Sequence, residues 1–142
     1  MDGKSRAIID GPVLPMGEGN AGGFVWRTKA VPADNSGMAD ADVANFSFDM
    51  FHDGGTNFMF VVMPPDAGED FVFMHTTDTI DYVVMLKGEV TLMLEAEEVK
   101  VRAGDFVVDR GVNHAWRNDG PGNAEYVVIT LPAHPVGKGK TV

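Results

Sequence analysis

The chain has 142 residues, a formal net charge of −10 and no cysteine. Its length fits one domain around a single core, and the lack of cysteine excludes disulfides, thiolate metal sites and a cysteine nucleophile. No basic run is present to neutralise phosphates, so we expect no nucleic-acid partner. There is no apolar stretch of membrane-spanning length and no apolar signal segment, so we expect no membrane partner and a cytoplasmic location.

Glycine and proline divide the first half of the chain into short segments, which predicts strands joined by turns. Residues 1–22 are rich in glycine and predict a loosely attached arm. Residues 23–29 predict a strand, residues 31–45 a loop, and residues 46–51 and 56–63 two more strands. Pro64 and Pro65 end the last of these, because proline cannot donate to a sheet ladder.

Strand patterns are densest in the second half of the chain. Strands are predicted over residues 71–75, 81–86, 90–94, 98–101, 106–109, 113–118 and 125–131. Residues 132–142 predict a disordered tail. Because no helical period is present, the sequence predicts an all-β fold with one antiparallel sandwich or barrel over residues 23–131.

Two histidines and one aspartate stand out on these strands. Asp81 shares a strand face with Val83 and Met85 by alternation, and both faces of that strand are largely apolar, so the carboxylate needs a partner. His75 and His114 lie on the two neighbouring segments. Three interpretations remain open: an open divalent-metal site, a metal-free acid–base pair, or a buried hydrogen-bond network without activity.

Apolar side chains are predicted around these three groups. Trp116 follows His114 by two residues and is either a stacking wall for a flat ligand or a core plug. An interior of this composition suits a mostly apolar, aromatic or polyketide-like compound. The side chains that we assign to substrate binding are Thr77, Val83, Met85, Trp116, Phe58 and Phe60.

The segments HTTDTIDYVV, LKGEV and GDFVVDRGVNHAWRN resemble the paired motifs of the cupin superfamily, which are small jelly-roll β-barrels. The first family motif runs His-x-His, three or four residues, Glu, six residues, Gly. The second motif contains Pro-x-Gly-x-x-His-x-x-x-Asn. This sequence matches them with His75, Thr77, Asp81 and Gly88, and with Asp109, Gly111, His114 and Asn118.

Three differences separate this chain from the family pattern. Thr77 replaces the second histidine, Asp81 replaces glutamate, and Asp109 stands where proline is usual. The resemblance implies that His75, Asp81 and His114 are the remaining metal ligands, for Fe, Mn, Ni or Zn. It also leaves open that the chain has lost its metal, since one of four usual ligands is missing.

The resemblance implies two main functions. The first is a metal-dependent enzyme in which Asp81 and His114 are catalytic, with dioxygenase-type or isomerase- or decarboxylase-type chemistry on a small molecule. The second is a non-catalytic cupin that binds a small ligand. Similar single-domain cupins occur in bacteria and beside fungal secondary-metabolite genes, and many cupins pair through their barrel edges, so we also expect a homodimer.

Overall fold

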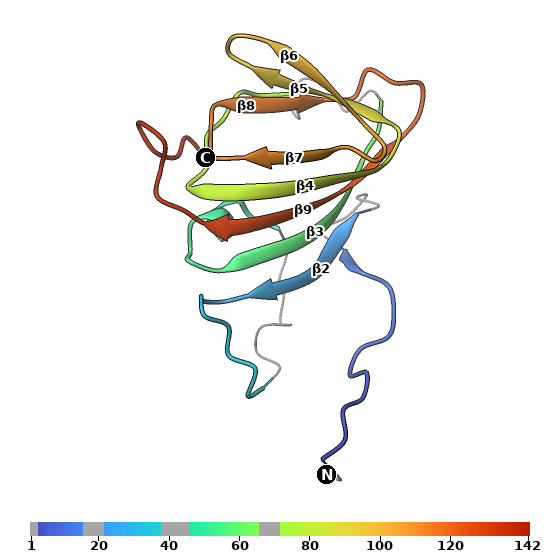
Figure 1. The fold of residues 1–142 in the computed structure, drawn as a ribbon, viewed down its shortest axis with the longest axis vertical. Helices are drawn as coiled ribbons and strands as arrows, with labels where there is room; N and C mark the ends of the chain where they lie inside the picture. The colour runs from blue at the N-terminus through green and yellow to red at the C-terminus, as the bar shows by residue number, and fades with distance from the viewer. Residues whose placement is uncertain (1–2, 16–21, 38–45, 66–71) are drawn as a thin grey trace.

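The computed structural model describes residues 3–15, 22–37, 46–65 and 72–142. Within these residues nine strands form two antiparallel sheets that face each other (Figure 1). The strands are β1 (Leu14–Pro15), β2 (Gly23–Thr28), β3 (Thr56–Met63), β4 (Thr79–Lys87), β5 (Glu89–Leu94), β6 (Glu98–Arg102), β7 (Phe106–Asp109), β8 (His114–Arg117) and β9 (Ala124–Pro132). The all-β prediction is confirmed.

One sheet has six strands in the order β1-β2-β3-β9-β4-β7, and the other has three in the order β6-β5-β8. The core lies between the two sheets, where alternate residues of each strand point inward. On β4 these are Val83 and Met85, which are 3% and 1% exposed. Tyr126 of β9 and Val90 of β5 are buried with them. The core therefore fills one end of the sandwich.

The segment before β3 is a short helix and not the strand predicted over residues 46–51. Residues Phe48–Phe51 form a single 3-10 turn, η2. Its N-cap is Ser47, whose hydroxyl accepts a hydrogen bond from the Asp49 backbone N–H at 3.3 Å. A serine with an aspartate two residues later favours this local capping over strand pairing, because the side chain satisfies a backbone donor.

Two other segments differ from the sequence prediction. The predicted arm contains β1, which pairs with β2 through Leu14 and Phe24. The predicted strand 71–75 pairs only at His75, within the described residues. Residues 16–21 of the arm, 38–45 of the predicted loop, 66–68 of the predicted turn and residue 71 lie outside the described residues.

The C-terminal residues are bonded to the site segment, in place of the predicted disorder. Thr141 donates its backbone N–H to the Thr76 carbonyl at 3.0 Å, and its hydroxyl accepts from the Thr76 N–H at 2.7 Å. Ala133 donates to the Asp78 carbonyl at 3.0 Å. The chain thus returns to the segment that carries His75. No helix in the described ranges is long and apolar enough to cross a membrane.

Candidate active site

The two histidines meet because their segments pair at one position. His75 and His114 exchange both backbone hydrogen bonds, at 2.9 and 3.0 Å, so they lie directly opposite each other. Opposite residues of an antiparallel pair share a face, and the two imidazole centroids are 4.5 Å apart. The backbone pairing therefore places both rings side by side at one end of the core.

Each imidazole is oriented through its Nδ1 atom. Nδ1 of His75 lies 3.0 Å from the Phe73 carbonyl oxygen, and Nδ1 of His114 lies 2.8 Å from the Val112 carbonyl oxygen. A carbonyl only accepts, so both rings carry their proton on Nδ1. The Nε2 atoms are then left for a ligand, which is how metal-binding histidines are usually held.

His114 also has a buried carboxylate beside it, on Asp109 at the end of β7. Oδ2 of Asp109 is 2.8 Å from His114 Nδ1, and both side chains are 3% exposed. This oxygen has no hydrogen bond, because the Nδ1–H points to the Val112 carbonyl, so the contact acts through charge. The other oxygen, Oδ1, accepts the N–H groups of Gly111 and Val112 at 2.8 and 3.1 Å. Asp109 therefore shapes the turn and places a negative charge against the ring.

The charges of this pair shift both pKa values. Burial lowers the pKa of His114, but the close negative charge of Asp109 outweighs it, and the net effect is a raised pKa. Burial raises the pKa of Asp109, but His114 and the two backbone donors outweigh burial, and the net effect is a lowered pKa. No carboxylate of the described residues contacts the His75 ring in this way, and burial lowers the pKa of His75. The two rings therefore have different proton affinities.

Asp81 lies at the start of the inward face of β4 with two threonines. Its Oδ1 accepts a hydrogen bond from the Thr79 hydroxyl at 2.6 Å, and that hydroxyl lies 2.8 Å from the hydroxyl of Thr77. Burial raises the pKa of Asp81 to about 6, although the Thr79 bond acts to lower it. A buried carboxylate with a raised pKa lacks a compensating cation.

These groups line one cavity of about 260 Å³ between the two sheets. The cavity's polar end is formed by His75, Asp81, His114 and Thr77, and the other described lining residues are apolar or aromatic except Thr130. An apolar cavity of about 150 Å³ holds benzene, so this one is large enough for a substituted single ring. The apolar wall includes Phe46, Phe48, Phe51, Phe73, Met59, Val61, Trp116, Tyr126 and Val128.

The structure therefore brings together five of the side chains singled out from the sequence: His75, Thr77, Asp81, His114 and Trp116. Val83 and Met85 share the inward face with Asp81 as expected, but they pack in the core and do not line the cavity.

The face assignment of β3 must be corrected. Phe58 and Phe60 point to the outer face, and their neighbours Met59 and Val61 line the cavity. The segment FMFVVM is apolar at every position, so its sequence could not set the phase of the alternation.

Asp109 and the phenylalanines of residues 46–51 are the site residues that the sequence analysis missed. Asp109 was noted only as a difference from the family motif. The sequence feature that could have identified Asp109 is its place as the one charged residue of the apolar strand FVVD. It lies three residues before Val112, where the turn leads to His114. The phenylalanines were assigned to a strand, although the spacing of Phe48 and Phe51 also fits one helical turn.

The donor set has the right chemistry for a divalent ion, but it is incomplete as a full ligand shell. Two imidazoles with Nε2 directed away from their backbone partners and one buried carboxylate are typical ligands of Fe, Mn, Ni and Zn. However, no group of three His, Asp or Glu side chains in residues 3–15, 22–37, 46–65 and 72–142 is arranged to hold a metal ion. The two imidazoles have the chemistry of metal ligands, and Asp81 lines the same cavity.

Two antiparallel sheets face each other, and histidines from paired segments lie at one end of a largely apolar cavity between them. The family model of the cupin domain matches residues 59–130, and the chain belongs to this family.

Several similar proteins come from fungi. The chain is 35% identical to phomopsin biosynthesis cluster protein D of Diaporthe leptostromiformis, over 80% of this chain and 61% of that protein. It is 41% identical to oryzines biosynthesis cluster protein J of Aspergillus oryzae, over 44% of this chain and 36% of that protein. It is 27% identical to the cupin-domain-containing oxidoreductase virC of Hypocrea virens, over 67% of this chain and 48% of that protein. The chain thus spans about a third to three fifths of the length of these relatives.

Among solved structures, the chain is similar to an RmlC-like cupin family protein with a double-stranded β-helix fold from Methanocaldococcus jannaschii. The TM-score is 0.45 and the identity 21%, over 54% of this chain and 70% of that one.

Proposed function

We propose that this chain is a metal-dependent cupin enzyme that acts on a small, largely apolar molecule in the barrel cavity. His75 and His114 would hold a divalent ion through their Nε2 atoms, with Asp81 as the third ligand. The observation that carries the proposal is the pair of Nδ1 contacts, to Phe73 and Val112, which orient both rings for a ligand. Three relatives named for biosynthesis clusters and one named an oxidoreductase support an enzyme of secondary metabolism.

The bound ion would supply either O₂ activation, if it is iron, or polarisation of a substrate carbonyl, if it is redox-inert. We favour the oxidoreductase, because two histidines and one carboxylate leave open positions for O₂ and substrate.

The apolar wall of the cavity determines which substrate can enter. The aromatic side chains, with Trp116 beside His114, would bind a substituted ring by stacking and exclude water. No lysine or arginine is among the described residues that line the cavity. The carboxylates of Asp81 and Asp109 would offset the charge of a divalent ion, which leaves little net positive charge to attract an anion. We therefore expect an uncharged substrate.

The polar groups of the chain then have separate roles. His114, with Asp109 behind it, would hold a positive charge at Nε2, either the ion or a proton. Without a bound ion, Asp81 has a pKa raised to about 6 and can accept or release a proton near neutral pH; with the ion, it would serve as a ligand. The Thr79 hydroxyl holds Asp81 in place by a hydrogen bond, and the Thr77 hydroxyl contacts Thr79.

The non-catalytic binding cupin is the second candidate. Two observations favour it: the three acidic and imidazole side chains are not arranged as a ligand set, and Thr77, which stands at the position of a family histidine, is engaged with Thr79. In that case the cavity would bind a neutral aromatic compound without an ion.

Metal analysis and thermal unfolding separate the two candidates. The protein is purified without chelators, and metal content and melting temperature are measured with added Fe(II), Mn(II), Ni(II) or Zn(II). A bound ion at 100 times its Kd adds about 2.7 kcal/mol, or a rise of about 8 °C. The rise should disappear in His75→Ala and His114→Ala and persist in His134→Ala, an exposed histidine outside the cavity. An unchanged melting temperature with all four ions would contradict the metal-dependent enzyme and favour the non-catalytic binding cupin.

A further inference from the structure

A row of polar side chains crosses the inner face of the six-stranded sheet. Its members are cross-strand neighbours on β2, β3, β9, β4 and β7, namely Arg27, Asn57, Thr130, Asp81 and Asp109. The next inward row along the strands is apolar and consists of Met59, Val128, Val83 and Val107. Buried polar groups destabilise a fold unless they are hydrogen-bonded, so the partners of the polar row show what it can do.

Asn57 is the best-fixed member of this polar row. It is 1% exposed, and its Oδ1 accepts a hydrogen bond from Nε of Arg27 at 2.9 Å. Its Nδ2 donates to the Met50 carbonyl at 3.0 Å and to the Thr130 hydroxyl oxygen at 2.9 Å. A guanidinium only donates and a carbonyl only accepts, so these contacts determine the orientation of the amide. Both Nδ2 protons are therefore used, and Thr130 is the acceptor in its bond with Asn57.

Thr130 consequently keeps its own hydroxyl proton for another acceptor. It is 1% exposed and lines the cavity. Within the described parts of the chain, the Asn57 amide is the one group hydrogen-bonded to this hydroxyl. Asp81 lies opposite Thr130 on β4, where paired residues have Cβ atoms about 5 Å apart, but the Asp81 carboxylate accepts its hydrogen bond from Thr79. The Thr130 proton is thus an unused donor inside the cavity.

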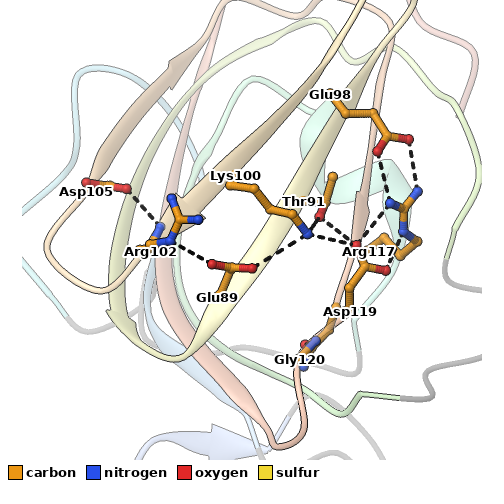
Figure 2. A network of polar contacts seen from close by, with 10 residues as sticks. Glu89, Thr91, Glu98, Lys100, Arg102, Asp105, Arg117, Asp119 and Gly120 are labelled. Atoms are coloured by element: carbon orange, nitrogen blue, oxygen red, sulfur yellow. Dashed lines mark hydrogen bonds and ion pairs between the residues drawn. The ribbon is translucent and has the colours of Figure 1, made fainter.

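A second buried threonine shows a hydroxyl whose donor and acceptor functions are both used. Thr91 of β5 is 0% exposed and is not among the residues that line the cavity. Its hydroxyl accepts from Nζ of Lys100 at 2.7 Å and donates to Oδ2 of Asp119 at 2.8 Å (Figure 2). The described residues give Thr91 both a donor and an acceptor, whereas they give Thr130 a donor alone.

The polar row also strengthens the unused donor. Arg27 is 8% exposed and forms an ion pair with Asp53. Its positive charge polarises the Asn57 amide, and the amide polarises the Thr130 hydroxyl, because successive hydrogen bonds in one direction reinforce each other. The best acceptor for this hydroxyl is an oxygen that is rich in electrons but carries no full charge, since an anion would be buried beside Asp81. A carbonyl oxygen has these properties.

We propose that Thr130 is a ligand-binding residue whose hydroxyl donates a hydrogen bond to a carbonyl oxygen, and that Asn57 and Arg27 position this hydroxyl. The ligand is a neutral cyclic carbonyl compound, with its oxygen near Asp81 and its ring against the apolar wall of the cavity. This inference rests on the proposed function in one respect, which is that the cavity binds a small molecule. It holds with or without a bound ion, and it distinguishes the ligand from a hydrocarbon of the same shape.

The test uses two probes of the same shape, acetophenone and α-methylstyrene, which differ in having a carbonyl oxygen or a CH₂ group. Their Kd values are measured by NMR titration of the full chain in EDTA, so that no ion can bind the carbonyl. In Thr130→Val the preference for acetophenone, taken from the ratio of the two Kd values, should fall about fivefold, which is the effect of one hydrogen bond. Thr130→Ser keeps the hydroxyl and should keep the ratio within about twofold. Thr91→Val is the matched control, because it removes a buried threonine hydroxyl outside the cavity, and it should leave the ratio unchanged.

A second measurement needs no variant. The infrared carbonyl stretch of carbon-13-labelled acetophenone bound to the wild-type chain should lie below its frequency in hexane, because a hydrogen bond weakens the C=O bond. This measurement tests the proposal even if Thr130→Val fails to fold, since that variant leaves an Asn57 amide proton without its acceptor.

The possible failures have different meanings. A Kd ratio that Thr130→Val leaves unchanged, an equal fall of the ratio in Thr91→Val, or an unshifted carbonyl stretch would overturn the proposal, and Thr130 would then have a structural role alone. If neither probe binds the wild-type chain, the small-molecule cavity itself is contradicted, and the proposed function fails together with this inference.

Discussion

Asp81→Asn should stabilise the metal-free protein at neutral pH, although it removes a proposed metal ligand. The carboxyl lies among buried residues, with one hydrogen bond from the Thr79 hydroxyl. Burial is the main reason that its pKa rises from 3.8 to about 6, and the nearby Asp109 adds to the rise. An asparagine keeps the shape and the oxygen that accepts from Thr79, and it removes the uncompensated charge.

The size of the effect follows from the pKa difference. A shift from 3.8 to about 6 corresponds to about 3 kcal/mol at about 1.4 kcal/mol per unit. A carboxyl with a raised pKa binds its proton more tightly in the folded state, so its contribution is fully favourable below about pH 4 and is lost as the pH rises through about 6. The wild type should therefore lose up to about 3 kcal/mol across this window, and the Asn variant should not.

The assay is urea unfolding in EDTA at about pH 4 and about pH 7.5. Asp81→Asn should match the wild type at the lower pH and be about 1–3 kcal/mol more stable at the higher pH. Asp119→Asn is the opposite control, because Arg117 lowers the pKa of that carboxyl, so its loss should reduce stability at neutral pH. A less stable Asp81→Asn at neutral pH would mean that the chain itself compensates this charge, and the reasoning would be refuted.

Three further predictions concern the same region. Asp109→Asn should lower the pKa of His114, measured by NMR titration of the ring, since the Asp109 charge raises it; an unchanged pKa would mean that the contact carries no charge effect. Gly111→Ala should cost about 1–3 kcal/mol in unfolding experiments, because φ is +72° and the new Cβ would lie 2.6 Å from the Thr77 carbonyl oxygen; a neutral result would contradict this close approach. Thr141→Ala should speed hydrogen exchange of the Thr76 amide, which bonds to the Thr141 hydroxyl; equal protection would show that the C-terminal residues do not hold the site segment.

The sequence predicted the fold and most of the polar end of the site, because both depend on local patterns. Alternation along β4 predicted one face for Asp81, Val83 and Met85, and the two motif segments predicted a shared site for His75 and His114, which the structure pairs directly. The glycines at 88 and 111 have φ angles of +74° and +72°, which explains why the motifs have glycine at these turns. The alternation along β4 and the glycine turns are each set within a few neighbouring residues of the chain.

The rest of the site depends on which residues of a strand point inward and on contacts between residues far apart in the chain. The apolar run of β3 gave no alternation, so Phe58 and Phe60 were assigned to the wrong face. The contact between Asp109 and His114 depends on the conformation of the turn between them, which residue types alone did not reveal. The return of the C-terminal residues to Thr76 spans 65 positions, and polar residues such as lysine and threonine carry no pattern that predicts such a contact.

The central claim is that the two imidazoles bind one ion through Nε2. The most direct test is a crystal structure of the protein with stoichiometric Zn(II) or Mn(II), with data collected at the absorption edge of the metal. We expect one anomalous peak about 2.0–2.2 Å from Nε2 of both His75 and His114, while Nδ1 keeps its contacts to Phe73 and Val112. A peak elsewhere, or ordered imidazoles without a peak between them, would contradict the claim.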